Sequence, residues 1–145
     1  MGENQDIPIN ERTVPFLFRR ALSFFPDKTF IRSADQSLTY SEFNDLTNCC
    51  ANRLAHQGLK KGGKLGIMMH NSTAFVHSWI AASKLGVIYV PINTDYKGDI
   101  LQYQLNKADV THLIVDVSLA ARVLDVINEL PQLQEVIVYD DGSKA

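Results

Sequence analysis

The 145-residue sequence lacks most of the features that mark membrane, secreted or disulfide-stabilised chains. Its only two cysteines, Cys49 and Cys50, are neighbours, and adjacency makes a mutual bridge sterically poor and argues against a disulfide framework. No apolar run approaches the roughly 18 residues that a membrane-spanning helix needs. The polar start has no apolar core of the kind found in secretory signals. The sequence therefore predicts a cytoplasmic protein without a transmembrane segment.

The sequence also lacks an excess of charge of either sign. Lysine and arginine number 14, aspartate and glutamate number 16, and the net charge is −2. Phosphate backbones are bound by basic stripes, so we expect no nucleic-acid partner. With 46% hydrophobic residues and a mean hydropathy of −0.08, the composition is typical of one globular domain. That length is short for an enzyme with a multi-substrate mechanism.

The first forty residues predict an arm, a helix and a hairpin. Residues 1–12 are polar and unpatterned, and we expect them to form a flexible arm. Thr13 is the predicted N-cap of a helix that ends at Pro26. The hairpin is predicted from two short strands, 29–32 and 37–39, and a turn at 34–36.

From Thr39 onward, helices alternate with short strands rich in Ile and Val. Thr39 and Glu42 form a predicted capping box, which opens a helix that ends at Gly58. The predicted strands are 64–69, 87–90, 112–115 and 135–139, and the helices between them are 71–86, 98–107 and 117–130. The strand 87–90 is expected to be buried and to be stopped by Pro91. This order indicates β-α-β units with short links. The predicted class is α/β: an N-terminal helix and β-hairpin, then a mostly parallel, doubly wound sheet of about four strands with flanking helices.

No segment carries the pattern of an active site. The glycine-rich stretch Gly58–Gly66 leaves a helix and enters a strand, whereas a phosphate loop does the reverse, so a helix stop and turn are favoured. Asp140 and Asp141 fit a solvated turn. The histidines are scattered without a further ligand at metal-binding spacing: His56, His70, His77 and His112. We therefore predict no catalytic residue and no metal site within these residues.

Several short segments nevertheless have a specific order and spacing. They are Thr13–Phe18, Phe25–Thr29, Leu38–Phe43, Gly58–Ile67, Asn71–Phe75 and Lys84–Asn93. Together they resemble, over residues 13–140, the opening helix, core motifs and connecting segments of the AMP-forming acyl-CoA synthetases of the adenylate-forming superfamily. Gly63 stands where that family usually has Asp. The continuation Tyr96–Leu105 is similar to crotonobetaine/carnitine-CoA ligase-like members.

The resemblance implies a longer enzyme. The family's phosphate loop, magnesium carboxylate, ribose-binding acid, hinge and catalytic lysine follow later in the chain, and no Ser-Gly-Thr-Thr-Gly run occurs here. Residues 13–140 are thus expected to be the N-terminal subdomain of a ligase, with 141–145 a truncated tail. The remainder of the ligase chain is the expected partner, and we expect this piece to be inactive alone.

The reaction that the resemblance implies belongs to fatty acid or carnitine metabolism and has two steps. A small carboxylic acid attacks the α-phosphate of ATP with Mg²⁺, and the acyl-adenylate then passes its acyl group to CoA. None of these ligands is expected to bind strongly to this piece. In some relatives a basic residue after the second core motif helps to hold the CoA nucleotide. Here Asp95 occupies that place, and the resemblance points to Asn93 and Lys97 on the CoA side, against an ordinary exposed lysine as the alternative.

Two other functions stay open. The chain could be a stand-alone α/β interaction module, or a nucleotide-binding module whose crevice lies at the carboxyl ends of the strands, near 71–72, 93–95 and Asp116. If the domain is incomplete, an uncovered sheet edge or helix face should promote self-association.

Overall fold

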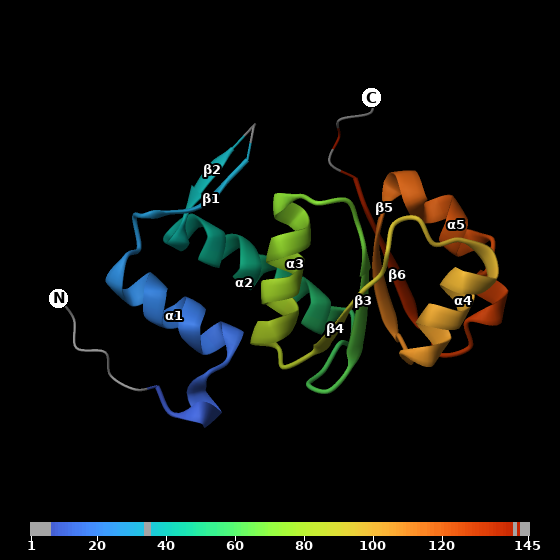
Figure 1. Ribbon diagram of the computed structural model, residues 1–145, viewed down its shortest axis with the longest axis horizontal. Coiled ribbons are helices and arrows are strands. Elements are labelled where there is room, and N and C mark those ends of the chain that lie inside the picture. Colours follow the sequence, from blue (N-terminus) through green and yellow to red (C-terminus); the bar gives the residue numbers. More distant parts are fainter. Residues whose placement is uncertain (1–6, 34–35, 141, 143–145) are drawn as a thin grey trace.

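The computed structural model describes residues 7–33, 36–140 and 142, and it confirms the predicted α/β architecture (Figure 1). The first elements are η1 (Ile9–Glu11), α1 (Val14–Phe24), β1 (Thr29–Arg32), β2 (Ser37–Thr39) and α2 (Tyr40–His56). The central elements are β3 (Lys64–Met68), α3 (Thr73–Lys84), β4 (Ile88–Pro91) and α4 (Gly98–Lys107). The last are β5 (His112–Asp116), η2 (Val117–Leu119), α5 (Ala120–Leu124), η3 (Ile127–Glu129) and β6 (Glu135–Tyr139).

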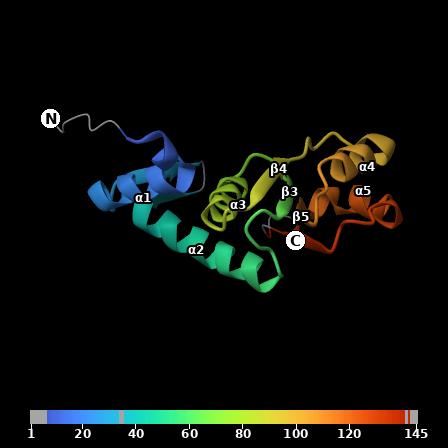
Figure 2. The same ribbon diagram turned by 90° about the horizontal axis from the view of Figure 1, so that it is seen from below.

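The larger sheet is wholly parallel and has the strand order β4-β3-β5-β6. Figures 1 and 2 show α2 and α3 on one side of it and α4 and α5 on the other. Successive residues of β3 point to opposite faces, so Leu65 and Ile67 pack with α2 and α3 while Met68 packs with α4 and α5. This two-sided burial is the doubly wound arrangement that the sequence predicts.

An aromatic cluster attaches α1 and the hairpin to the rest of the molecule. The ring of Phe18 lies 5.3 Å from that of Phe30 in β1 and 5.7 Å from that of Phe43 in α2, measured between centroids. Tyr40 lies 4.7 Å from Phe30. Because Phe18 and Phe43 are buried, these edge-on and tilted contacts fix α1 against α2.

The capping box predicted at the start of α2 is confirmed. The backbone N–H of Thr39 donates to Glu42 Oε2 at 2.8 Å, and the N–H of Glu42 donates to Thr39 Oγ1 at 3.2 Å. The bond from the Thr39 backbone, followed by that from its hydroxyl, lowers the pKa of the Glu42 carboxyl. At the other end, Gly58 has a φ of +93°, which only glycine adopts without strain.

One predicted helix is wrong. The segment 117–130 is not a continuous α-helix: it divides into η2, α5 and η3. The division begins where the Asp116 carboxylate accepts the N–H of Ser118, a local turn that competes with helical pairing. It recurs where Val126 N–H bonds to the carbonyl of Val123, three residues back rather than four.

The strand predicted at 87–90 is also placed differently from expectation. Instead of a buried strand stopped by proline, β4 is an edge strand that includes Pro91, and Ile88 is 52% exposed. Proline is tolerated there because an edge strand leaves one row of backbone groups unpaired.

The terminal and turn predictions are only partly covered. In the predicted arm, the structure describes residues 7–12, which include η1, whereas residues 1–6 lie outside the described residues. Residues 34–35 of the predicted turn also lie outside them, as do residues 141 and 143–145 of the predicted tail. Among the helices that the structure describes, none has the length and apolar character required to cross a membrane.

Candidate functional site

The carboxyl ends of β3 and β5 bring two polar side chains together. His70 follows β3 and Asp116 ends β5, and the His70 Nδ1 atom lies 3.2 Å from Asp116 Oδ2. The other carboxylate oxygen of Asp116 accepts the Ser118 hydroxyl at 2.6 Å and its N–H at 2.9 Å. The Ser118 hydroxyl is the largest cause of the lowered pKa of Asp116, with smaller contributions from the Ser118 backbone and His70. This edge therefore carries a fixed carboxylate beside an exposed imidazole.

A second loop meets the same edge after β4. The Oδ1 atom of Asn93 accepts the N–H of Asp95 at 2.9 Å, so the amide side chain is used in the loop's own turn. Arg122 of α5 reaches across and donates to the backbone carbonyl of Thr94. The sequence analysis does not predict this role of Arg122. The only sequence signal for it is a single basic residue within a largely apolar segment.

Lys97 lies at the N-cap of α4, where its side chain is exposed and makes no capping hydrogen bond within the described chain. Asn93 is exposed as well. The residues predicted to line a crevice, 71–72, 93–95 and Asp116, all lie at the carboxyl ends of β3, β4 and β5, as a doubly wound fold requires. The role of Asn93 and Lys97 towards CoA stays a prediction, because exposure alone does not assign a ligand.

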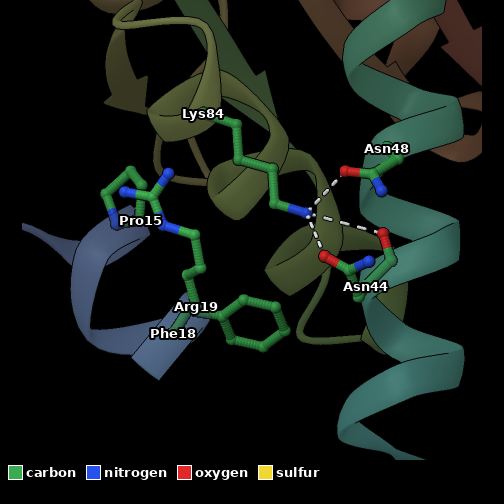
Figure 3. Close-up of a pocket in the computed structure, with 6 residues that line it drawn as sticks. All are labelled: Pro15, Phe18, Arg19, Asn44, Asn48 and Lys84. Carbon is green, nitrogen blue, oxygen red and sulfur yellow. Dashed lines mark hydrogen bonds between the residues drawn. The ribbon is translucent and has the colours of Figure 1, made fainter. Parts of the chain in front are cut away.

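A pocket of about 260 Å³ lies between α1, α2 and α3, away from the carboxyl edge. Figure 3 shows its lining residues: Pro15, Phe18, Arg19, Asn44, Asn48 and Lys84. The Lys84 ammonium donates to the Oδ1 atoms of Asn48 at 2.8 Å and Asn44 at 2.9 Å, and also to the hydroxyl of Thr47. Its Nζ atom lies 5.4 Å from the centroid of the Phe18 ring.

These contacts define what the pocket can do. An ammonium group has three protons, and three side-chain oxygens of α2 accept them. Burial lowers the pKa of Lys84, partly offset by the charge of Asp45. Because its donors are already used, Lys84 joins α3 to α2 rather than offering a free cation to a ligand. Sequence reasoning identifies Lys84 only as the start of a motif, since its partners lie in a distant segment.

The remaining reactive groups include two cysteines and the half-buried His77. Within the residues that the structure describes, no three His, Cys, Asp or Glu side chains are grouped closely enough to hold a metal ion. Cys49 is exposed and Cys50 is half-buried. Burial raises the pKa of the Cys50 thiol, which makes it a poor nucleophile. Burial has the opposite effect on the basic imidazole of His77 and lowers its pKa. The buried Nδ1 atom of His77 has no hydrogen-bond partner among the described residues.

The fold is shared with solved structures that include a CoA ligase. The anthranilate CoA ligase AuaEII, in complex with anthranoyl-AMP, matches with a TM-score of 0.85 and 26% identity, over 92% of this chain and 26% of that chain. The inhibitor-bound N-terminal domain of FACL13 from Mycobacterium tuberculosis matches with a TM-score of 0.81 and 27% identity, over 88% of this chain and 33% of that chain. The parallel sheet and its helices thus have the architecture of an N-terminal region of such ligases.

The family is shown by sequence. The model of the AMP-binding enzyme family matches residues 18–145, and the chain belongs to that family. A medium/long-chain-fatty-acid–CoA/3-oxocholest-4-en-26-oate–CoA ligase from Mycobacterium tuberculosis is 30% identical over 127 residues, which are 88% of this chain and 23% of the relative. The medium/long-chain-fatty-acid–CoA ligase FadD6 from the same organism is 30% identical over 118 residues, 81% of this chain and 20% of the relative. The chain therefore spans less than a quarter of the length of these ligases.

Proposed function

We propose that this chain is the N-terminal part of an AMP-forming acyl-CoA ligase and supplies scaffold rather than chemistry. The match to the AMP-binding enzyme family over residues 18–145 is the observation that carries the proposal. The chain also spans less than a quarter of the length of the ligases to which it is similar, which supports a scaffold role. The whole ligase would activate a carboxylic acid with ATP and Mg²⁺ and transfer the acyl group to CoA.

The contribution of these residues would be positional. The sheet presents the loops after β3, β4 and β5 at one edge, where Asp116 fixes the orientation of His70 and Arg122 holds the loop at Thr94. We propose that the exposed Asn93 and Lys97 lie on the CoA side of that edge in the whole enzyme. A lysine there would attract the phosphates of the CoA nucleotide as a point charge.

The acyl substrate is proposed as a fatty-acid type of carboxylic acid. Relatives named for medium- and long-chain fatty acids and for 3-oxocholest-4-en-26-oate support this choice. The similarity of Tyr96–Leu105 to crotonobetaine/carnitine-CoA ligases is a competing prediction, and the comparisons do not confirm it. A panel containing octanoate, palmitate and crotonobetaine, assayed with the longest product of the genomic reading frame, distinguishes the two.

The test of the proposal uses the chain itself and a longer product. Translation of the genomic sequence beyond Ala145 should reveal a Ser/Thr/Gly-rich phosphate loop, and the longer protein should catalyse carboxylate-dependent exchange between pyrophosphate and ATP. Calorimetric titration of the 145-residue chain with ATP, AMP and CoA should show no strong binding. Clear ATP binding by this chain would instead favour the stand-alone nucleotide-binding module.

A further inference from the structure

The pocket between α1, α2 and α3 carries positive charge that no acidic side chain of its lining balances. Arg19 contributes a guanidinium group from α1, and Lys84 contributes an ammonium group from α3 (Figure 3). Among the described residues that line this pocket, none is Asp or Glu. Burial lowers the pKa of Lys84 and the charge of Asp45 partly offsets this, but Asp45 lines a different cavity, together with Leu38 and Cys49. The lining therefore holds two cations and no carboxylate.

Lys84 contributes charge to this pocket rather than hydrogen bonds. Its protons are accepted by the Oδ1 atoms of Asn44 and Asn48 and by the hydroxyl of Thr47. All three oxygens are uncharged, so they satisfy the donors of the ammonium group without neutralising it. The ammonium is therefore held in one place, and its positive charge is not cancelled by the side chains that hold it.

The same contacts fix the direction of two amide groups. An ammonium group only donates hydrogen bonds, so the Oδ1 atoms of Asn44 and Asn48 face Lys84, and each Nδ2 group keeps its protons for another acceptor. Within the described chain, neither these Nδ2 groups nor the guanidinium of Arg19 has a hydrogen-bond partner. The side-chain groups of the lining that are still available for bonding are therefore donors, which suits a ligand that only accepts hydrogen bonds.

The size and the charge of the pocket point to a small oxyanion. Its volume of about 260 Å³ lies below the roughly 300–1,000 Å³ of sites for drug-sized ligands. Pro15 and Phe18 supply apolar walls, beside which charges attract each other more strongly than in open water. The oxygens of a tetrahedral phosphate can face Arg19 on one side and the charge of Lys84 on another, whereas a planar carboxylate presents both oxygens to one side. Arginine is also the side chain whose planar donors match phosphate oxygens.

We propose that the pocket between α1, α2 and α3 binds a phosphate-type oxyanion, with the Arg19 guanidinium as the main hydrogen-bond donor and the Lys84 ammonium as a fixed positive charge. A free phosphate or pyrophosphate is favoured over the phosphate of a nucleotide, because the volume of the pocket is small for a base and a ribose in addition. The proposal is independent of the ligase function, since this pocket lies away from the carboxyl edge of the sheet.

The test is an NMR titration of the 145-residue protein with inorganic phosphate. Sodium chloride keeps the ionic strength constant, so that general screening of charge does not change during the titration. The side-chain N–H signals of Arg19, Asn44 and Asn48 should shift and should reach saturation at millimolar phosphate. Absence of saturable shifts at these three residues overturns the proposal.

Two matched pairs of variants assign the binding to the pocket. R19Q should weaken phosphate binding at least about tenfold, because charge-assisted hydrogen bonds are lost. R20Q makes the same change at the next residue of α1, outside the lining, and should have little effect. N48D should also weaken binding at least about tenfold, because its carboxylate still accepts from Lys84 but repels the anion. N52D, one turn further along α2, is the control for N48D.

The controls separate a built site from a response to net charge. Equal losses within a pair, in R19Q and R20Q or in N48D and N52D, contradict the proposal. Each variant should keep the thermal unfolding midpoint of the wild type, because none of the four positions is buried. If R19Q unfolds, R19K replaces it; R19K keeps the charge without the planar donors, and its affinity should lie below that of the wild type.

Titrations with acetate and AMP test the class of ligand. Acetate should bind more weakly than phosphate, and AMP should bind no more tightly than phosphate. Tighter binding of acetate would make the pocket a carboxylate site, and tighter binding of AMP that R19Q abolishes would make it a nucleotide site. Either result contradicts the assignment of a free phosphate-type oxyanion.

Discussion

The ammonium group of Lys84, in the last turn of α3, lies 2.8 Å from the Oδ1 atom of Asn48 in α2 and so joins helices that are distant in sequence. The same group reaches Asn44 and the fully buried Thr47. One charged side chain therefore bridges three positions of a neighbouring helix, in the pocket that residues of α1 also line (Figure 3).

Replacing Lys84 by methionine should destabilise the protein by about 1–3 kcal/mol, because charge-assisted hydrogen bonds are lost and the buried oxygen of Thr47 loses its donor. Urea unfolding followed by circular dichroism measures the effect. Lys107→Met, at the exposed end of α4, is the matched control and should change stability by less than about 0.5 kcal/mol. An unfolding midpoint for K84M equal to that of the wild type would show that the bridge is energetically neutral.

The half-buried His77 should make the stability of the protein depend on pH in the mildly acidic range. Burial lowers the pKa of His77 below its ordinary value of 6.5, so between those two pKa values the unfolded chain binds more protons than the folded one. The stabilisation is complete above pH 6.5 and is lost as the pH falls towards the folded pKa. His77→Phe should flatten this dependence in urea titrations between about pH 5 and pH 7.5. His56→Phe, at the exposed end of α2, should retain the pH dependence of the wild type. If stability depends on pH as steeply in H77F as in the wild type, His77 is not its cause.

Asp116 should make the stability of the protein depend on pH in a separate, more acidic pH range. Hydrogen bonds from Ser118 lower its carboxyl pKa below the ordinary 3.8, so its contribution is present above that value and is lost as the pH falls through the folded pKa. Asp116→Asn should lower stability at neutral pH, where the charged carboxylate stabilises the fold, and should reduce the steepness of acid unfolding below about pH 4. Asp125→Asn is the control on the same segment. Identical acid-unfolding curves for D116N and the wild type would contradict this assignment.

Gly66 should not tolerate a side chain. A Cβ atom at this position in β3 would lie 2.8 Å from Leu113 Cδ1 and 3.0 Å from Val110 Cγ1, both in the core. Gly66→Ala should therefore cost about 1–3 kcal/mol through overpacking, measured by chemical denaturation. Leu113→Val removes the nearer methyl group, and the G66A/L113V double variant should lose less than the sum of the two single losses. Strict additivity would place the cost of G66A outside this contact.

The local elements can be predicted from the sequence because their signals are local. The capping box at Thr39 and Glu42 acts over three residues, and its two hydrogen bonds are present. Gly58 and Gly86 mark the ends of α2 and α3 with positive φ angles of +93° and +67°. The alternation of helices with apolar strands is sufficient to predict a doubly wound sheet, because parallel strands require helical crossovers.

The remaining features depend on neighbours that are far apart in the chain. The strand order places β4 at the edge of the sheet, and this order cannot be read from a single sequence. The apolar pattern therefore predicts a buried Ile88, whereas Ile88 is exposed in the structure. The oxygens around Lys84 and the link from Arg122 to Thr94 arise only when separate helices and loops meet. At the candidate site, Asn93 and Lys97 are predicted from a resemblance, and the structure adds that both are exposed.

The place of β3 in the sheet has a consequence for how the protein is made. β3 lies between β4 and β5, and both of these neighbouring strands follow it in the chain. While the polypeptide is being synthesised, residues 64–68 therefore emerge before either neighbour exists, with both rows of backbone groups unpaired. An apolar strand in that condition is prone to pair with other chains. We therefore expect the speed at which residues 88–116 follow to influence the yield of folded protein, although it leaves the finished sheet unchanged.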